Sequence, residues 1–413
     1  MTDLFTPLTL PNGTQLSNRL CKAAMEENLC DAGQIPGDRL VTLYQQWAQG
    51  GVGLILTGNV MVSPDALTGP GGVVLQNDQH LDRFKAWASA AKKGGAQVWM
   101  QLSHPGRQVY AAMGEQAVAP SAIALNIPGF SKMFAQPRAL EEHEIKDIIQ
   151  RFANASALAE QAGFTGCQIH AAHGYLLSQF LSPLTNKRED QWGGSLENRA
   201  RFLFATVDAV RAKVSSDFCV SIKLNSADFQ KGGFDQADAK WVVEQLNSRK
   251  VDLVELSGGS YESPAMQGNS SDDSTGEREA FFIQFAGEIA RVANMPIMVT
   301  GGIRRRQVAI DALDDSAGYG VSVLGVARAM AFVPDLPNAW QADQKLDVEL
   351  PRLSWENSTI AALGVMSMTK AQLNRMAKGL QPKAGVNPIL SIIQDRLNTR
   401  LRTKRYRRWR EQS

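Results

Sequence analysis

Short apolar runs alternate with longer amphipathic segments along most of the chain. The apolar runs are five or six residues long, which is typical of buried strands, and the segments between them are long enough for helices. Strands and helices in alternation predict parallel βαβ units. The predicted strands are residues 19–23, 53–57, 96–101, 166–170, 219–224, 252–256, 296–300 and 320–324.

The segments between these runs carry signals for the beginning and end of helices. Residues 78–93 and 140–162 are amphipathic, and glycine follows each of them, as is common where a helix ends. Ser195 and Asp235 precede two further helical patterns. Their side chains can accept hydrogen bonds from the first backbone N–H groups, so we expect both to be N-caps.

Eight strands, each followed by a helix, predict a (β/α)8 TIM barrel, an α/β fold, in residues 1–340. Residues 341–413 would then form a C-terminal helical extension with a basic tail. A doubly wound sheet is disfavoured because its dinucleotide-binding turn requires Gly-x-Gly-x-x-Gly after the first strand. Here the first strand continues into Ala24, Met25, Glu26 and Glu27.

One connection is much longer than the barrel requires. Residues 103–138 follow the third strand and are rich in proline, glycine and alanine. Long loops at the active face of a barrel are usually functional. We therefore expect this segment to form a lid or a wall of the substrate pocket.

Composition limits the class of protein. Of 413 residues, 44% are hydrophobic and 20% charged, which suits a protein with a large core and excludes collagen, wholesale disorder and small disulfide scaffolds. We see no secretory or transit signal and no apolar stretch long enough to cross a bilayer. These observations predict a cytoplasmic enzyme.

The four cysteines are scattered along the chain. Cys21, Cys30, Cys167 and Cys219 have spacings that fit neither a zinc site nor an iron–sulfur cluster. We expect them to be buried free thiols in strands.

The fourth predicted strand ends in the most reactive part of the sequence, His170-Ala-Ala-His173-Gly-Tyr175. Two imidazole N–H groups that converge on one point can polarise a carbonyl or hold an enolate, and a phenol beside them can deliver a proton. The alternatives are a metal-binding pair and two structural histidines. We predict no metal site, because no third ligand accompanies the pair at a suitable spacing.

Two further polar side chains belong to predicted strands. Lys223, in the fifth strand, would either form a Schiff base or supply a fixed positive charge, since its run is too apolar for a solvated lysine. Gln101 ends the third strand, and its amide can donate and accept hydrogen bonds at once.

The last two predicted strands are followed by a phosphate-binding pattern. Gly301 and Gly302 follow the seventh strand, and Ala327 and Arg328 follow the eighth. In many barrels the loops after these strands bind phosphate through backbone N–H groups. Tight turns that need glycine for backbone reasons are the alternative.

Taken together, these residues resemble the Old Yellow Enzyme family of flavin-dependent ene-reductases. The similarity extends over the predicted barrel, through Gly301-Gly302 and as far as Arg328. The segments that carry it are Leu4-Phe5-x-Pro7, Asn18-Arg19, His170-Ala-Ala-His173-Gly-Tyr175-Leu, Phe180-Leu-Ser-Pro183-Leu-Thr-Asn186 and Gly193-Gly194-Ser195-Leu-Glu197-Asn198-Arg199-x-Arg201-Phe202.

The resemblance implies FMN as the cofactor, bound at the C-terminal mouth of the barrel. The residues implied to contact it are Ala23, Ala24, Met25 and Asn59 along the ring, Gln101 at the pyrimidine edge, Lys223 near N1 and the C2 carbonyl, and Gly301, Gly302, Ala327 and Arg328 at the phosphate. It also implies that His170 and His173 hold the carbonyl oxygen of an activated alkene and that Tyr175 protonates the neighbouring carbon.

The implied reaction is ping-pong. NADPH or NADH transfers hydride to flavin N5 and leaves, after which an α,β-unsaturated carbonyl compound accepts that hydride at its β-carbon. Three positions depart from the family pattern: Glu26 replaces threonine or cysteine, Asn59 replaces a small residue, and Lys223 replaces arginine. A carboxylate at position 26 would oppose flavin reduction unless it is protonated or turned away.

Other functions remain open at this level. A flavin-free lyase or aldolase could use Lys223 as a Schiff-base nucleophile, and a barrel with Glu26 beside the ring could bind flavin or another ligand without efficient catalysis. The last 18 residues carry eight basic side chains and one acid. We expect this tail to form a solvated or subunit-contacting helix, as in a homo-oligomer, rather than to bind a membrane or nucleic acid.

Overall fold

Eight parallel strands close into a barrel in the computed structural model, which describes residues 3–259, 262, 285–314 and 320–412. The closure is complete because the first barrel strand pairs with the last and the third pairs with the fourth. In order around the barrel, the strands are β3 (Leu20–Lys22), β4 (Leu54–Leu56), β7 (Gln97–Ser103), β10 (Gly166–Ala171), β11 (Cys219–Asn225), β12 (Leu253–Ser257), β13 (Ile297–Thr300) and β14 (Val321–Val326). The predicted TIM barrel and all eight predicted strands are confirmed.

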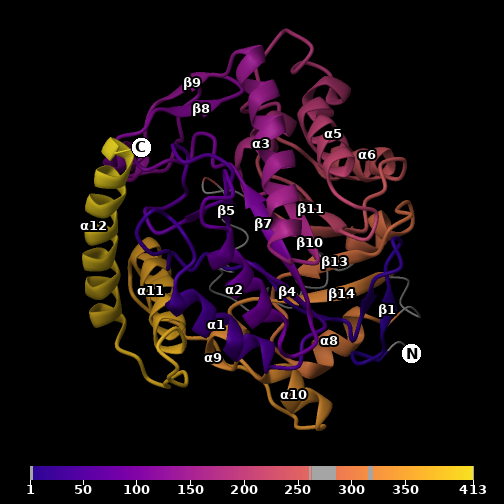
Figure 1. The fold of residues 1–413 in the computed structure, drawn as a ribbon, viewed down its shortest axis with the longest axis vertical. Coiled ribbons are helices and arrows are strands. Elements are labelled where there is room, and N and C mark those ends of the chain that lie inside the picture. The colour runs from indigo at the N-terminus through magenta and orange to yellow at the C-terminus, as the bar shows by residue number, and fades with distance from the viewer. Residues whose placement is uncertain (1–2, 260–261, 263–284, 315–319, 413) are drawn as a thin grey trace.

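Helices surround the barrel (Figure 1). The longer ones are α1 (Asp38–Ala48), α2 (Leu81–Lys92), α3 (Glu142–Gln161), α5 (Leu196–Lys213), α6 (Gln236–Leu246) and α8 (Arg306–Ala312), and the short ones are α4 (Leu176–Leu181), α9 (Ala329–Phe332) and α10 (Leu336–Gln341). Ser195 accepts a hydrogen bond from Asn198 N, and Asp235 accepts one from Asp238 N. Both predicted N-caps are therefore confirmed.

A small apolar cluster fills the lower interior of the barrel. Its members come from most of the barrel strands, among them Cys21 in β3, Leu54 in β4, Trp99 in β7 and Met298 in β13, all of which are fully buried. A Cβ added at Gly166 would lie 2.6 Å from Trp99 Cδ1, so this position has room only for glycine. The packed interior leaves chemistry to the strand ends, where polar side chains begin.

Short strands lie at both ends of the barrel. At the N-terminal end, β1 (Leu8–Thr9) pairs with β2 (Gln15–Leu16). At the C-terminal end, β5 (Val60–Met61) pairs with both β6 (Val73–Val74) and β7. The long loop after β7 contains η1 (Ala111–Met113), η2 (Ser131–Met133) and a parallel pair, β8 (Ala117–Ala119) and β9 (Pro137–Ala139). Its role as a lid or wall stays a prediction.

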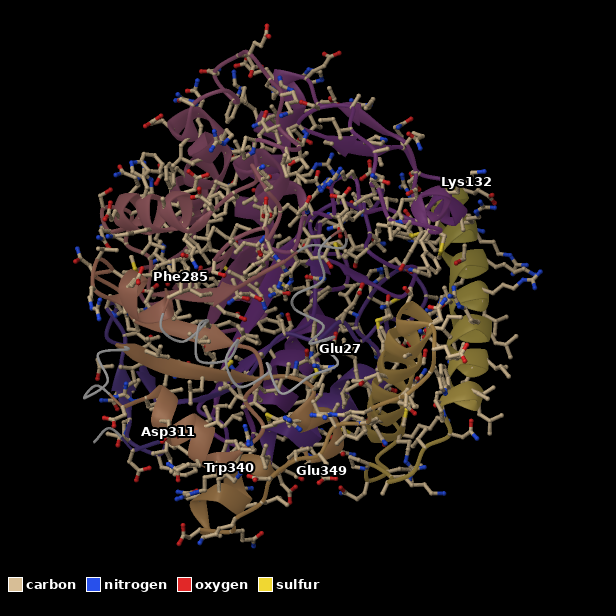
Figure 2. All side chains as sticks on the ribbon, turned by 180° about the vertical axis from the view of Figure 1, so that it is seen from behind. Glu27, Lys132, Phe285, Asp311, Trp340 and Glu349 are labelled. Carbon is tan, nitrogen blue, oxygen red and sulfur yellow. The ribbon has the colours of Figure 1, made fainter. Side chains whose placement is uncertain are left out.

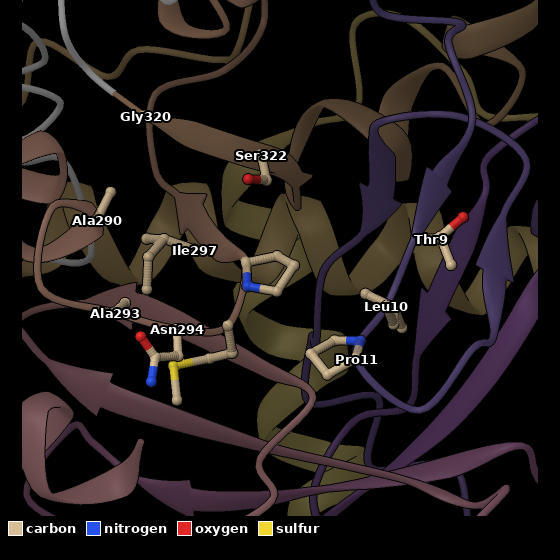
Figure 3. Close-up of a pocket in the computed structure, with 11 residues that line it drawn as sticks. Thr9, Leu10, Pro11, Ala290, Ala293, Asn294, Ile297, Gly320 and Ser322 are labelled. Atoms are coloured by element: carbon tan, nitrogen blue, oxygen red, sulfur yellow. The ribbon is translucent and has the colours of Figure 1, made fainter. Parts of the chain in front are cut away.

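A cavity of about 460 Å³ lies at the N-terminal end of the barrel (Figure 3). Thr9, Leu10 and Pro11 line one side of it, and Asn294 and Ser322 lie on the other. Asn294 precedes β13, Ser322 is at the beginning of β14, and the other three residues belong to the β1–β2 hairpin, so the cavity is at the opposite end of the barrel from the predicted site.

Two long helices follow the barrel, as predicted for the C-terminal extension. They are α11 (Ser358–Met376) and α12 (Pro388–Gln412), and α12 lies along one edge of the molecule (Figure 1). Tyr406 is fully buried, and its hydroxyl oxygen lies 2.9 Å from Pro64 O and 3.0 Å from Glu115 Oε1, so its one proton serves these two acceptors. The basic helix is thus fastened to loops at the C-terminal end of the barrel.

All four cysteines are buried and free; Cys21, Cys167 and Cys219 lie in strands, as predicted, whereas Cys30 lies in the segment after β3. Among the described residues, none of the helices combines the length and apolarity needed to span a bilayer.

Candidate active site

The predicted site residues lie at or just beyond the C-terminal ends of the barrel strands, which point to the same end of the barrel. By strand, they are Ala23, Ala24 and Met25 after β3, Asn59 after β4, Gln101 in β7, His170 in β10 with His173 and Tyr175 after it, Lys223 in β11, Gly301 and Gly302 after β13, and Ala327 and Arg328 after β14.

Two imidazoles and a phenol meet at the end of β10. The ring centroids of His170 and His173 are 5.0 Å apart, and those of His170 and Tyr175 are 4.7 Å apart. Desolvation lowers the pKa of both histidines well below the usual value, and the charge of Lys223 lowers both further. Both imidazoles are therefore neutral near pH 7, so each has one N–H group and one bare nitrogen.

The backbone assigns the proton of His170. The N–H of Ala172 donates to His170 Nδ1 at 3.2 Å, which makes Nδ1 the acceptor and places the ring proton on Nε2. His170 thus has an N–H group to donate away from its own backbone.

A serine hydroxyl controls the second imidazole. His173 Nε2 lies 2.7 Å from Ser257 Oγ, at the end of β12. If the serine donates to Nε2, the ring proton of His173 is on Nδ1, where it is available to a ligand. If the serine accepts, the ring proton is on Nε2 and is already hydrogen-bonded to Ser257. Only the first arrangement provides two N–H donors from the histidine pair.

The backbone of His173 has a conformation that side chains with a Cβ seldom adopt. Its φ is 60°, and that of Gly174 is 72°. The strained turn is held by hydrogen bonds from His173 N to Asn225 Oδ1 at 3.0 Å and from Gln108 Nε2 to His173 O at 3.0 Å. Such strain is retained where the surrounding contacts over-determine it, and here it turns the chain toward Tyr175.

Tyr175 is 5% exposed, and its hydroxyl accepts a hydrogen bond from Asn59 Nδ2 at 3.4 Å. Asn59 lies just after β4 and Tyr175 after β10, so this contact bridges the end of β7, the strand that lies between them. Accepting from Asn59 is compatible with donation of the phenol proton to another group.

Four buried polar side chains inside the barrel are joined by hydrogen bonds. Lys223 Nζ donates to Glu255 Oε1 at 2.7 Å, Gln168 Nε2 donates to Glu255 Oε2 at 2.8 Å, and Gln101 Nε2 donates to Gln168 Oε1 at 2.7 Å. Gln101 and Lys223 are 2% and 3% exposed, and Gln168 and Glu255 are completely buried. The four side chains come from the neighbouring strands β7, β10, β11 and β12.

The segment after β3 is fixed by two carboxylates. The Thr68 hydroxyl donates to Glu26, so that carboxylate is engaged with the segment after β5. Glu27 is 8% exposed and accepts hydrogen bonds from Tyr44 Oη at 2.5 Å and Gly58 N at 3.2 Å. Burial raises the pKa of Glu27. Figure 2 labels Glu27 well inside the outline of the molecule.

The glycine loop after β13 and the residues after β14 form an exposed cationic corner. Gly301 and Gly302 are exposed with φ of 151° and 68°, and a Cβ built at Gly301 would meet no atom within 4 Å. Desolvation, followed by the nearby charge of Arg304, lowers the pKa of the half-buried Arg328. Neither the guanidinium of Arg304 nor that of Arg328 forms a hydrogen bond or ion pair with another described residue.

These features fit a phosphorylated cofactor with a polar ring. Two neighbouring arginines repel each other, and a phosphate dianion would relieve that repulsion. At the ring end, Asn59 Oδ1 and Thr300 Oγ1 are buried without a hydrogen-bond partner among the described residues, and buried polar atoms normally have one. The donors, acceptors and cations thus suit FMN at this mouth.

Sequence reasoning missed several residues that now appear important. The sequence pattern does not single out Arg304, because it lies in a segment just before a helix. It does not single out Ser257 either, because one serine at the end of a strand is common. Glu255 and Gln168 carried a usable signal: each is a polar residue inside an otherwise apolar buried strand. Among the described residues, no three His, Cys, Asp or Glu side chains are grouped so that they could hold a metal ion.

The sequence of this chain is similar to those of known proteins. Residues 3–347 match the NADH:flavin oxidoreductase / NADH oxidase family. The NADH-dependent flavin oxidoreductase iliE of Hypocrea jecorina (strain QM6a) is 38% identical over 354 residues, which are 80% of this chain and 87% of that protein.

Solved structures show the same likeness. Morphinone reductase in complex with tetrahydroNAD is 26% identical with a TM-score of 0.69, over 85% of this chain and 93% of that one. A 2-naphthoyl-CoA reductase complex is 26% identical with a TM-score of 0.74, over 83% of this chain. This chain spans only 52% of that reductase.

Proposed function

As a member of the NADH:flavin oxidoreductase / NADH oxidase family, this chain is a flavin-dependent NAD(P)H oxidoreductase, and we propose that it is an FMN-dependent ene-reductase. It would take hydride from NADH or NADPH and reduce an alkene conjugated to a carbonyl. The resemblance to Old Yellow Enzymes found in the sequence supports this assignment, and the neutral histidine pair at the barrel mouth is the observation that carries it.

We infer the cofactor contacts from the chain's own residues. Gly301, Gly302 and Arg328, with Arg304 added by the structure, would hold the phosphate. Ala327 would lie beside the phosphate as well. The contacts proposed for the ring are Ala23, Ala24, Met25, Asn59, Gln101 and Lys223. When bound there, FMN would supply the hydride-accepting and hydride-donating chemistry, and the barrel would supply its position and electrostatic surroundings.

The substrate contacts follow from the histidine tautomers. His170 Nε2–H and, with Ser257 donating, His173 Nδ1–H are two neutral donors for one carbonyl oxygen. Such donors stabilise the negative charge that develops on oxygen when the β-carbon is reduced. Tyr175 lies beside His170 and would protonate the α-carbon.

Relatives support the choice of substrates. One matched structure is a morphinone reductase with tetrahydroNAD bound, and another is a 2-naphthoyl-CoA reductase with its CoA ester. Morphinone is named as a ketone and 2-naphthoyl-CoA as a thioester, so both names include a carbonyl group. We infer a small activated alkene as the partner of this site.

The test uses the purified protein and its visible spectrum. The preparation should be yellow or become so with FMN, and anaerobic NADH or NADPH should bleach it. Cyclohexenone should then restore the colour and yield cyclohexanone. Tyr175→Phe should slow colour recovery about 100-fold while leaving bleaching within about twofold, since general acid catalysis contributes about 10²–10⁴. A protein that remains colourless with added FMN would refute the proposal.

The Schiff-base alternative receives less support. Lys223 Nζ is 2.7 Å from a buried carboxylate, so it is held in an ion pair rather than presented as a free amine. Borohydride treatment with a carbonyl substrate should therefore leave the mass of the peptide containing Lys223 unchanged.

A further inference from the structure

We propose that Glu255 is the positioning residue of the cofactor site, because it neutralises Lys223 and, through Gln168, fixes the direction in which the Gln101 amide points. This inference rests on the FMN site proposed above. It assigns a role to two side chains, Glu255 and Gln168, that neither contact the alkene nor belong to the histidine site.

Strand register places the four side chains in reach of one another. Lys223 lies directly opposite Glu255 in the β11–β12 pair, and Gln168 lies directly opposite Gln101 in the β10–β7 pair. Gln168 is two residues before His170, so it points into the barrel in the layer beneath the histidine. The chain of hydrogen bonds therefore connects Lys223 and Gln101, the two side chains proposed to contact the polar edge of the ring.

The direction of these hydrogen bonds is fixed at one end. The ionised Glu255 carboxylate can only accept, so Gln168 must turn its Nε2 toward Oε2 and its Oε1 away. Oε1 of Gln168 then accepts from Gln101 Nε2 at 2.7 Å. The amide of Gln101 is thereby set with its oxygen on the other side, which defines the acceptor it offers to the pyrimidine edge.

Charge balance is the second consequence. The side chains of Lys223 and Glu255 are 4% and 0% exposed, and a buried charge without its partner is strongly disfavoured. With both Lys223 and Glu255 present, the ion pair has no net charge. Reduction adds negative charge to a flavin, so an unpaired lysine would favour reduction and an unpaired glutamate would oppose it.

The experiment measures the midpoint potential of bound FMN and the FMN dissociation constant in wild-type protein and three charge variants. We expect Glu255→Gln to shift the potential to more positive values and Lys223→Met to shift it to more negative values. The double variant should return close to wild type. A role limited to packing would not produce shifts of opposite sign that cancel.

Gln168→Leu tests the hydrogen-bond chain without changing charge. We expect a several-fold rise in the FMN dissociation constant, since Gln101 loses the acceptor that orients it, and a smaller change of potential than in either single charge variant. Ser221→Ala is the matched control, because Ser221 is also completely buried in β11, two residues before Lys223, but bonds to Cys167 O instead. Its potential and affinity should equal those of wild type.

The outcomes separate this inference from the proposed function. A wild-type protein that binds no FMN overturns both. A wild-type protein that binds FMN, with potentials that move in the same direction or not at all in the two single variants, overturns the role of Glu255 alone. If Glu255→Gln does not fold, the double variant and Gln168→Leu decide the question, and thermal unfolding of each apoprotein shows which variants are folded.

Discussion

At His173, one hydroxyl decides which ring nitrogen carries the proton. Ser257 Oγ lies 2.7 Å from Nε2, and the histidine is neutral because its pKa is lowered well below the usual value by desolvation and by Lys223. The second of the two donors proposed to bind the carbonyl therefore depends on a side chain that does not need to touch the substrate.

Ser257→Ala should raise the KM for an enone about fivefold, because a hydrogen bond is worth about 1 kcal/mol and its loss frees the imidazole to adopt the other tautomer. The rate at which NADH bleaches the protein should not change. Stopped-flow measurement of the two half-reactions checks this.

Ser257→Thr retains the hydroxyl and should behave like wild type. Ser226→Ala is the control for an ordinary buried serine at a neighbouring strand end, since Ser226 is 2% exposed. An equal rise in KM in both alanine variants would mean that the effect is not due to the His173 tautomer.

At the scale of elements, helix α12 depends on few buried contacts. Only Ser391 and Tyr406 are buried along its 25 residues, whereas Ile389, Leu390 and Leu397 are more than half exposed. The Tyr406 hydroxyl joins the helix to Pro64 and Glu115, and Arg410 Nε adds a contact to Glu115 at 2.8 Å.

Tyr406→Phe should weaken this attachment by about 1–3 kcal/mol, because buried acceptors lose their donor. The expected result is faster cleavage by trypsin within the basic end of α12, measured by mass spectrometry over time. Leu397→Ala, on the exposed face, should leave the cleavage rate unchanged. Equal rates in wild type and Tyr406→Phe would contradict the anchoring role.

The elements themselves were largely predictable, and their cross-connections were not. Buried barrel strands produce continuous apolar runs, so all eight were found from local pattern alone. Pairs of two residues, such as Leu8–Thr9 with Gln15–Leu16, have no local signal because partners elsewhere in the chain define them. Likewise, the sequence shows Lys223 and Glu255, but only strand register shows that they pair.

At the scale of the whole molecule, buried neutral histidines limit stability in acid. Burial lowers the pKa of His104 to about 4, and His170 and His173 are also lowered. Between pH 6.5 and pH 4 the unfolded chain binds protons that the folded chain does not. The free energy of unfolding should therefore fall as the pH falls through this window.

For His104 alone, the shift from 6.5 to about 4 corresponds to about 3 kcal/mol at the acid end. His104→Asn keeps an acceptor for Gly106 N and should lose less stability than wild type between pH 7 and pH 4.5, measured by urea unfolding. His143→Asn, at an exposed position, should follow the wild-type curve. Parallel curves for all three proteins would contradict the expectation.

Closure of the barrel also constrains the order of events during synthesis. Strand β3 can complete its pairing only with β14, which joins residues 20–22 to residues 324–326. A nascent chain must therefore emerge from the ribosome into its final quarter, as far as residue 326 of 413, before the rim is continuous. Until then the strands around Lys223 and Glu255 do not form a closed barrel. A translation stall before residue 326 should therefore yield a product that cannot retain a prosthetic group.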